Sequence, residues 1–584
     1  MKKKFIFMLI ALLAFNIQSC QDFLKEELVS EVAGGYYTSA AGLEDAVDAT
    51  YFYLKFIYSN ERAYTLNAFG TDTYTNGADG NFKGFNYYDN TLNSAQSVLT
   101  EMWQFLYRGI NQANAVIGRS ANGITDMDAT RLLTRQAEVR FLRAMYYFTL
   151  VRQWQDVHLS LEETIGAQVT ANKTPSAQIY AEAIIPDLQF AIDNLPATQS
   201  DYGRATKGAA QHLMGLALLT RGWATNNAAD FSTAEARFTD VINNAAYGLV
   251  SDHASLWNQD NTRNREIIFA VQNATNTILN GGEGTPGEGN RGHLYFLMEY
   301  DIRPGMIRDI ANGRPFKRFR PTNYLYDLYA AGRDKDNRYD QTYKHVYVSN
   351  NGAANAALNW TAANVTAGAK NRDGSPAVVG QRKFTVGDTA IFLPGPGRDA
   401  IWTATKKLQT RYAVFTRTPN GAANTGYDER IFAHISKFID PRRPTIQWME
   451  GSRDWFVYRL ADTYLLRAEA RFKQGNTTGA AADINVVRTR AAKPGKVADM
   501  QITPAQVTLD FILDERAMEL DAEQCRWYDL VRTGTLVARV LMHNPQAPGI
   551  KSFHVRRPIP QLQIDRTQGG YVQNCGYPGA PACN

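Results

Sequence analysis

Long helical patterns of apolar residues occur near both ends of the chain. In Ala137–Trp154, apolar residues return every three or four positions, and most of the remaining positions are apolar as well. A helix that is apolar nearly all round is buried. Phe456–Gln474 and Leu509–Thr533 repeat this spacing, and Gly475 follows the first of them as a helix stop. The pattern predicts a mainly α-helical protein with buried helices at both ends.

A weak internal repeat links two of these helical segments. The run Leu213–Leu219 resembles Leu466–Phe472 in its alternation of small and large residues, and Gly222 follows the first as a stop. Each run precedes a second one with matching small and apolar positions, at 234–241 and 480–487. Small residues at fixed spacing let a partner helix approach closely, as in tetratricopeptide-type helix pairs. We therefore expect a tetratricopeptide-like helical scaffold whose period is too degenerate for a regular solenoid.

The middle of the chain has a different character. Residues 251–450 are rich in Gly, Asn, Thr, Tyr and Pro, with short β-prone pieces such as Glu266–Gln272. Long irregular stretches are uncommon unless functional, and binding residues gather on loops held by a rigid scaffold. A second tyrosine-rich, glycine-punctuated loop spans Gly70–Asn90. We expect an N-terminal helical region at 21–250, a loop-rich region at 251–450 that carries the candidate ligand-binding face, and a C-terminal helical region at 451–584.

The first twenty residues have the pattern of an export signal. Lys2–Lys4 precede the apolar run Phe5–Phe15, which is shorter than the roughly 20 residues that cross a bilayer. Cys20 stands where cleavage is expected and resembles the cysteine of a bacterial lipobox. Its acyl chains would provide about 0.8 kcal/mol of membrane affinity per buried methylene. We expect a signal peptide at 1–19 and a lipidated Cys20; a plain secretory signal with an incidental cysteine is the alternative.

Composition narrows the class of function. A chain of 584 residues exceeds what one compact core usually contains. The formal net charge is +5, and three of those charges are leader lysines. The mature chain is therefore nearly neutral, which argues against a nucleic-acid-binding surface. Four cysteines are too few for a disulfide framework, although Cys575 and Cys583 could close a small loop in the Gly/Pro-rich tail.

Motifs that would indicate a cofactor or catalysis are weak. Gly282, Gly284 and Gly287 have the spacing of a dinucleotide fingerprint, but Pro286 interrupts them and no helix follows. The eight histidines are scattered, so we expect no metal site and no cofactor. The basic and aromatic run Arg314–Arg320 is interpreted as structural packing. Glycoside hydrolysis depends on a spatial separation of two carboxylates that sequence spacing cannot establish, and an enzyme therefore ranks below a binding protein.

Several motifs, in a consistent order along the chain, resemble the SusD/RagB family. They are Gln136–Arg152, Arg459–Ala470, Ile512–Leu520 and Arg526–Gly534, with Cys20–Leu24 and Arg557–Gln561 towards the two ends. Together they cover essentially the whole mature chain. Gln155 and His158 replace the glycine and proline that commonly follow the first motif, a departure that concerns one local turn.

The resemblance implies an outer-membrane lipoprotein that faces the cell exterior on a tetratricopeptide-like scaffold. Proteins of this family cap a SusC-like TonB-dependent transporter barrel and bind oligosaccharides, or in some members peptides, for import. The family offers no catalytic residue to carry over. We therefore interpret the chain as an oligosaccharide-binding lipoprotein and not an enzyme. A peptide-binding member of the family is the first alternative, and a glycoside-acting enzyme is the second.

Candidate ligand contacts follow from the chemistry of sugars. Sugar rings present apolar C–H faces and a rim of hydroxyls, so a site needs exposed aromatic platforms beside short polar side chains. The loop Gly70–Asn90 and the segment Arg291–Tyr300 combine such residues, and a further tryptophan lies in a Gly/Asn/Thr-rich loop. The predicted ligand-binding residues are Asp72, Tyr74, Asn81, Tyr87, Tyr88, Tyr295, Tyr300 and Trp360. For each of them, the alternative is that the side chain pins its loop to the scaffold.

Overall fold

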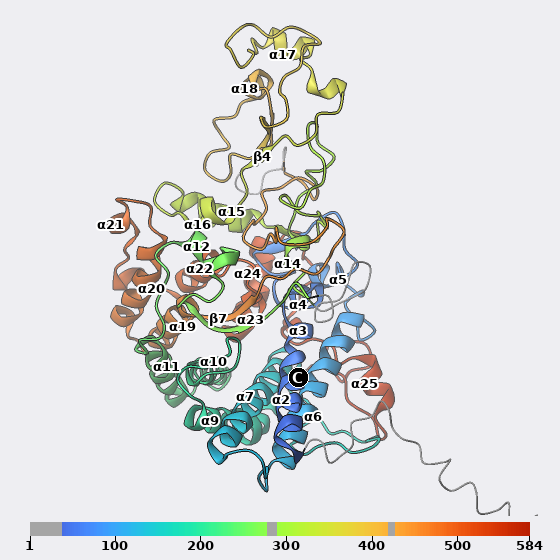
Figure 1. Cartoon of the computed structure of the whole chain (residues 1–584), viewed down its shortest axis with the longest axis vertical. Coiled ribbons are helices and arrows are strands. Elements are labelled where there is room, and N and C mark those ends of the chain that lie inside the picture. Colours follow the sequence, from blue (N-terminus) through green and yellow to red (C-terminus); the bar gives the residue numbers. More distant parts are fainter. Residues whose placement is uncertain (1–37, 277–288, 418–426, 584) are drawn as a thin grey trace, which may run out of the picture.

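The apolar helices from both ends of the chain pack into one helical body, from which a loop-rich lobe projects (Figure 1). The computed structural model describes residues 38–276, 289–417 and 427–583, so Cys20, where lipidation is predicted, lies outside the described residues. The prediction of a mainly helical protein with short β pieces is confirmed. Within the described residues, no helix combines the length and apolar character that a bilayer crossing requires.

Two long helices dominate the N-terminal part. The elements here are α2 (Ala40–Phe52), α3 (Leu54–Ile57), α4 (Glu61–Asn67), β1 (Tyr74–Asn76), α5 (Gly84–Tyr87), α6 (Ser97–Arg119), α7 (Ala129–Trp154), α8 (Ser176–Ile179), a π-helical turn at Tyr180–Ile184, and α9 (Ile185–Asn194). The segment predicted at Ala137–Trp154 forms the buried part of α7. Gly109 of α6 lets the two helices approach closely, since a Cβ there would lie 2.5 Å from the ring of Tyr146.

The predicted helix pairs are present and pack against each other. They are α10 (Lys207–Thr225) with α11 (Ala228–Ile242), and α19 (Leu460–Lys473) with α20 (Thr477–Ala491), and α11 also packs on α19. Gly215 admits Phe238, whose ring would be 2.7 Å from an added Cβ. Gly222 is not the stop that the sequence predicted: it lies inside α10 against Phe231, and the helix ends at the left-handed Asn226 (φ 52°).

Two C-terminal helices are shorter than predicted. Residues Trp455–Arg459 form β7, which pairs antiparallel with β2 (Ile267–Val271), and α19 begins only after it. The predicted segment Leu509–Thr533 divides into α22 (Leu509–Glu519) and α23 (Arg526–Arg532). Ala522 and Gln524 adopt positive φ between them, which ends helical geometry. The other helices of the C-terminal region are α21 (Val497–Met500), α24 (Leu536–His543) and α25 (Gln561–Arg566).

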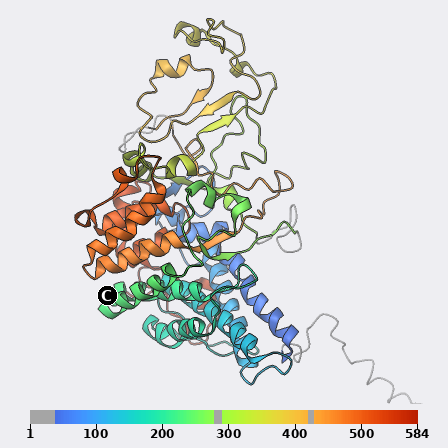
Figure 2. The same cartoon turned by 60° about the vertical axis from the view of Figure 1, so that its left-hand side comes forward.

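The middle region supplies connections to the body and then the projecting lobe. Connecting elements are α12 (His253–Leu256), α14 (Gly292–Tyr295), β3 (Phe319–Pro321), α15 (Asn323–Gly332) and α16 (Arg338–Thr342). The lobe contains α17 (Ala362–Thr366), α18 (Ala404–Gln409) and a sheet of β4 (Val346–Val348), β5 (Thr389–Phe392) and β6 (Ala413–Val414). Figure 2 shows this sheet at the base of the lobe, above the helices. Short turns at 259–261, 356–358, 504–506 and 552–555 complete the structure.

Buried ion pairs tie the middle region to the C-terminal helices. Arg459 contacts Glu266 at 3.0 Å, Glu519 at 2.7 Å and Glu523 at 2.7 Å, and all four side chains are buried. Arg338 of α16 contacts Glu515 at 2.8 Å and Glu519 at 3.3 Å. Removing one partner of such a network leaves an uncompensated buried charge, which is strongly destabilising. These charged residues therefore hold the scaffold in one arrangement.

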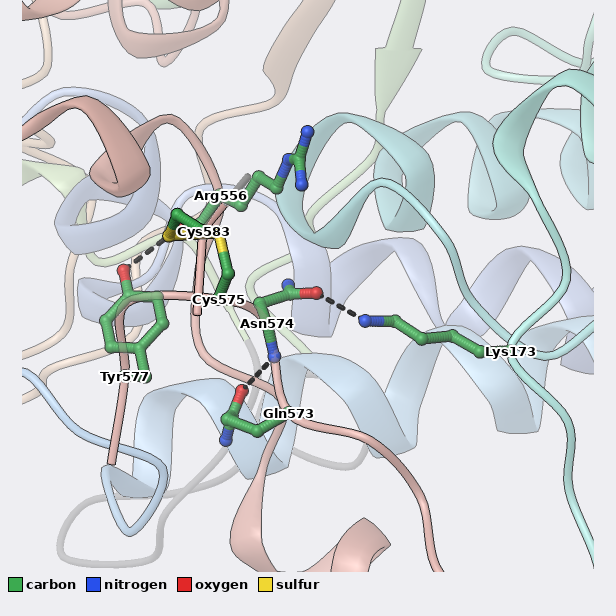
Figure 3. The surroundings of a disulfide bond; sticks show 7 residues. All are labelled: Lys173, Arg556, Gln573, Asn574, Cys575, Tyr577 and Cys583. Atoms are coloured by element: carbon green, nitrogen blue, oxygen red, sulfur yellow. Dashed lines mark hydrogen bonds between the residues drawn. A yellow bond between two sulfur atoms is a disulfide. The ribbon is translucent and has the colours of Figure 1, made fainter. Parts of the chain in front are cut away.

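A disulfide closes the C-terminal tail between Cys575 and Cys583 (Figure 3). Next to it, Asn574 accepts a hydrogen bond of 2.6 Å from Lys173 and donates through its side chain to the carbonyls of Trp154 and Arg557. The tail is therefore fixed to the end of α7 and to the loop that follows α7.

Candidate ligand-binding surface

Five of the six aromatic residues predicted as ligand platforms are buried. Tyr74, Tyr88, Tyr295, Tyr300 and Trp360 are each between 0 and 3 % exposed. A sugar ring cannot stack on a side chain that presents no face to solvent. The expectation that these five residues form exposed platforms is therefore corrected.

Three of these tyrosines use their hydroxyl groups in bonds within the protein. Tyr74 donates to Asp521 at 2.6 Å, Tyr88 to the carbonyl of Gly70 at 2.7 Å, and Tyr300 to the carbonyl of Gly313 at 2.5 Å. Burial raises the pKa of each of these tyrosines. These tyrosines pin their loops to the scaffold, which is the alternative to a ligand contact.

The two predicted loops meet, whereas Trp360 lies elsewhere. Strands β1 and β3 pair antiparallel, and Tyr74 contacts Phe296 at a centroid distance of 5.2 Å, which joins the loop Gly70–Asn90 to the segment Arg291–Tyr300. Trp360 precedes α17 in the lobe at the top of Figure 1, and it packs in a small cluster of that lobe.

The three remaining predicted residues divide between core and surface. Asp72 is fully buried and accepts hydrogen bonds from Arg526 and Arg539 at 2.5–2.8 Å. Asn81 is exposed and Tyr87 is half-buried. Asn81 and Tyr87 therefore keep the accessibility that a ligand contact requires.

A cleft of about 660 Å³ offers a better-formed site and was not predicted. Its walls come from the ends of α2 and α3, the loop at 201–204, residues 259–263, the end of β2 and residues 442–454. Phe52 at its rim is 48 % exposed, which makes it the most exposed aromatic side chain among the described residues. Tyr202 provides a second aromatic wall and donates its hydroxyl to the carbonyl of Thr262 at 2.6 Å.

Backbone geometry brings the walls of the cleft together. Gly203 has a φ of +98°, and a Cβ there would lie 2.8 Å from the side chain of Gln272. Glycine therefore allows the loop at 201–204 to touch the end of β2. Gln272 and Asn273 follow that strand, and the backbone N–H of Asn273 donates to Asp454 at 2.9 Å.

The cleft mixes amides with charges of both signs. Arg204 donates to Asp48 at 2.7 Å and to Asp201 at 3.1 Å, so that two of the carboxylates share one guanidinium. Burial raises the pKa of Asp454, and the backbone hydrogen bond from Asn273 opposes this rise. Burial lowers the pKa of Lys55, and the negative charge of Asp454 opposes this fall. An aromatic rim above amide, carboxylate and ammonium groups matches the alternating apolar faces and hydroxyls of a sugar chain.

One sequence signal could have indicated this cleft. The run Tyr51–Tyr58 contains five aromatics in eight residues. Helical periodicity assigns such a run to the core, but here the helix ends at Phe52, and a short second helix starts at Leu54. Phe52 lies on the exposed face of α2, in line with Asp45 and Asp48. No local pattern shows that residues 201–204 and 442–454 come together beside it.

Comparisons with known proteins agree on one family. Residues 265–577 match the model described as the SusD family, and residues 22–222 match one described as starch-binding associating with outer membrane. A SusD-like protein of Formosa agariphila is 24 % identical over 591 aligned residues, covering 96 % of this chain and 98 % of that protein. The starch-binding protein SusD of Bacteroides thetaiotaomicron is 24 % identical over 507 residues, covering 83 % and 80 % of the two chains.

A similar fold occurs among solved structures. A laminarin binding SusD-like protein superimposes with a TM-score of 0.66 at 24 % identity, covering 92 % of this chain and all of that one. This likeness concerns the fold, and it agrees with the helical body described above.

Proposed function

Because this chain belongs to the SusD family, we propose that it binds an oligosaccharide in the cleft at Phe52 and passes it to a SusC-like TonB-dependent transporter. The exposed ring of Phe52 above a cleft lined by amides and charges is the observation that carries this proposal. The names of relatives support a glycan as ligand: one is a starch-binding protein, and a similar structure is a laminarin binding protein.

The same proposal includes the cell surface as the place of action. Lipidation at Cys20 would tether the mature chain to the outer membrane, facing the exterior, and a matching family model is described as associating with that membrane. The function is then capture and delivery, without a chemical step. The division into regions 21–250, 251–450 and 451–584 belongs to the proposal too, although residues of the first and last regions also line the cleft.

Affinity measurements with a glycan panel test the site. Soluble protein lacking residues 1–20 is titrated with laminarin, starch and a mixed peptide digest. We expect Phe52→Ala to weaken glycan binding by about tenfold, as truncation of a hot-spot aromatic costs on the order of 1–2 kcal/mol. The melting temperature should stay nearly unchanged, because the side chain is half exposed.

Tyr87→Ala is the matched control, because Tyr87 is the accessible aromatic among the residues predicted from sequence. If Tyr87→Ala weakens binding and Phe52→Ala does not, the site lies on the loop Gly70–Asn90. If the wild type binds the peptides and neither glycan, the protein is a peptide-binding member of the family. Release of reducing ends from a bound glycan would contradict the absence of catalysis.

A further inference from the structure

A second and larger hollow borders Tyr53, the residue that follows Phe52 at the end of α2. This groove has a volume of about 920 Å³ and is bounded by α6, by the loop at 158–171 and by α25. Phe52 lines the cleft, and the next residue, Tyr53, lines the groove. Their ring centroids are 6.3 Å apart. The cleft and the groove are thus lined by two consecutive residues of the chain.

A ridge of aromatic rings joins the two hollows. Phe56 lies 5.2 Å from Phe52 and stacks on Phe105 of α6 at 3.9 Å between centroids. The guanidinium of Arg108, which lines the groove, lies 5.6 Å from the centre of the Phe105 ring. Phe56 and Phe105 are half-buried. A chain of ring contacts therefore leads from Phe52 to Arg108 at the groove.

The groove is a built structure and not a gap between mobile loops. Its floor is fixed by a bond of 3.0 Å from Trp103 Nε1 to Gln563 of α25 and by a bond of 2.8 Å from the Tyr107 hydroxyl to the carbonyl of His158. Two backbone bonds between Val157 and Thr174, at 3.2 and 2.9 Å, close the base of the loop wall.

The disulfide-closed tail supports the same wall from outside. Lys173 bonds to Asn574 beside the disulfide, as Figure 3 shows, and the backbone N–H of Gln568 donates to the carbonyl of Val169 at 2.7 Å. A groove held in this way needs little ordering when a ligand enters, which favours affinity.

The groove is lined mainly by polar groups, which favours a sugar chain over a protein partner. Its lining includes the amide of Gln104, the carboxylate of Glu162 and the cations of Arg108 and Arg566. Fully buried protein interfaces are depleted in charged residues at their centre. Hydroxyl groups, in contrast, use amides, carboxylates and guanidiniums as hydrogen-bond partners.

We propose that cleft, ridge and groove form one continuous track for an extended oligosaccharide. One part of the chain lies in the cleft, the next crosses the rings of Phe52, Phe56 and Phe105, and the end enters the groove beside Arg566. This inference rests on the proposed function and adds to it the ligand class: an oligosaccharide longer than the cleft alone accommodates.

A chain-length series measured by calorimetry tests the track. The probes are laminaribiose and laminarihexaose, with maltose and maltohexaose as a second series. For the wild type, the hexasaccharide of at least one series should bind at least tenfold more tightly than its disaccharide. Phe105→Ala and Arg566→Ala should reduce that ratio at least threefold without changing the affinity for the disaccharide. Arg566 is exposed, so its variant tests the track even if Phe105→Ala unfolds.

Phe316→Ala is the matched control. Phe316 is half-buried and lies between the guanidiniums of Arg314 and Arg318 at 5.2 and 5.3 Å, much as Phe105 lies between those of Arg62 and Arg108. It lines neither hollow and packs against Tyr295 rather than against the ridge, so its variant should keep the full ratio.

Four outcomes would overturn the track. Equal affinity for disaccharide and hexasaccharide in the wild type would refute an extended ligand, while the proposal that the cleft binds an oligosaccharide would stand. An unchanged ratio in both Phe105→Ala and Arg566→Ala shows that neither the ridge nor the groove contacts the ligand. If the wild type binds no probe of either series, the proposed function and the track fail together. Loss of co-purification with the transporter barrel in Phe105→Ala, with the ratio unchanged, would assign the ridge to protein docking instead.

Discussion

The hydroxyl of Tyr74 donates a 2.6 Å hydrogen bond to Asp521, across 447 positions of the chain. Asp521 also accepts hydrogen bonds from Tyr329 at 3.1 Å and Tyr343 at 2.7 Å. Burial raises the pKa of this carboxyl, and Lys437 and the three tyrosines oppose that rise. A loop that looked like a ligand platform in the sequence is thus joined to the C-terminal helices through one buried carboxylate.

Removing that hydroxyl should destabilise the protein. In Tyr74→Phe, Asp521 loses one of three donors while buried, which costs about 1–3 kcal/mol of unfolding free energy. Denaturant titration measures this loss. Tyr87→Phe, at a half-buried surface position, should change stability by less than about 0.5 kcal/mol. An equal effect of the two variants would show that the bond to Asp521 contributes nothing specific.

Asp72 provides a second test of the buried network. It lies between Arg526 and Arg539, and Asp72→Asn would leave the buried guanidinium of Arg526 without the anion it pairs with, whereas Arg539 would keep its contacts with Asp510 and Asp514. We expect a loss of about 3–5 kcal/mol, measured by chemical denaturation. Asp79→Asn is the control, because Asp79 is exposed and its contact with Lys317 at 3.3 Å is worth at most about 1 kcal/mol. Comparable losses in the two variants would contradict the structural role of Asp72.

The stability of the protein should fall between about pH 6.5 and pH 4, in part because of His212. Burial lowers the pKa of this histidine from 6.5 to about 4. In that window the unfolded chain binds a proton that the folded chain does not, so the free energy of unfolding decreases as the pH falls and is largest above 6.5. The shift corresponds to roughly 3 kcal/mol. His212→Gln should flatten the measured slope; an unchanged slope would show that other groups produce it.

Helical periodicity was sufficient to predict the scaffold. The spacing of apolar residues in Ala137–Trp154 identified the buried part of α7, and the small-residue pattern identified the paired helices α10–α11 and α19–α20. It failed at Gly222, because a glycine that admits Phe231 from a partner helix looks in sequence like a helix stop. Which role a glycine has depends on the neighbour, and the neighbour is set by tertiary structure.

The candidate site could be predicted only in part, for a related reason. Gly- and Tyr-rich composition indicated loops, but it does not show whether an aromatic side chain turns towards solvent or towards the body. Tyr74 is buried in β1, which pairs with β3, and Tyr295 is buried at the end of α14, where its carbonyl accepts a bond from Arg318 just before β3. Phe52 faces solvent because it lies on the exposed face of α2, in line with Asp45 and Asp48. The walls of the cleft come from five separate stretches of chain, and their proximity exists only in the folded protein.

Membrane attachment should depend on Cys20. If its thiol carries the lipid, Cys20→Ala will lose the acyl groups detected by mass spectrometry and will leave the membrane fraction. The wild type should co-purify with a large β-barrel protein from mildly solubilised outer membranes. Cys525→Ala is the control, because Cys525 is a half-buried cysteine of the helical body and its loss leaves the anchor untouched. Full membrane retention of Cys20→Ala would refute lipidation at this position.

The disulfide should matter to the tail and groove more than to the helical body. Cys575 and Cys583 are separated by 8 positions, and closing so short a loop stabilises by roughly 2–3 kcal/mol. The double substitution C575S/C583S should therefore increase hydrogen exchange at residues 568–577 and 169–174, which the bonds of Gln568 and Lys173 connect. Exchange in α7 should change little, because its buried face packs elsewhere in the core. Reducing agent should produce the same pattern in the wild type and no further change in the double variant. If exchange in the loop at 169–174 is unaffected while the tail loosens, the tail does not support the groove wall.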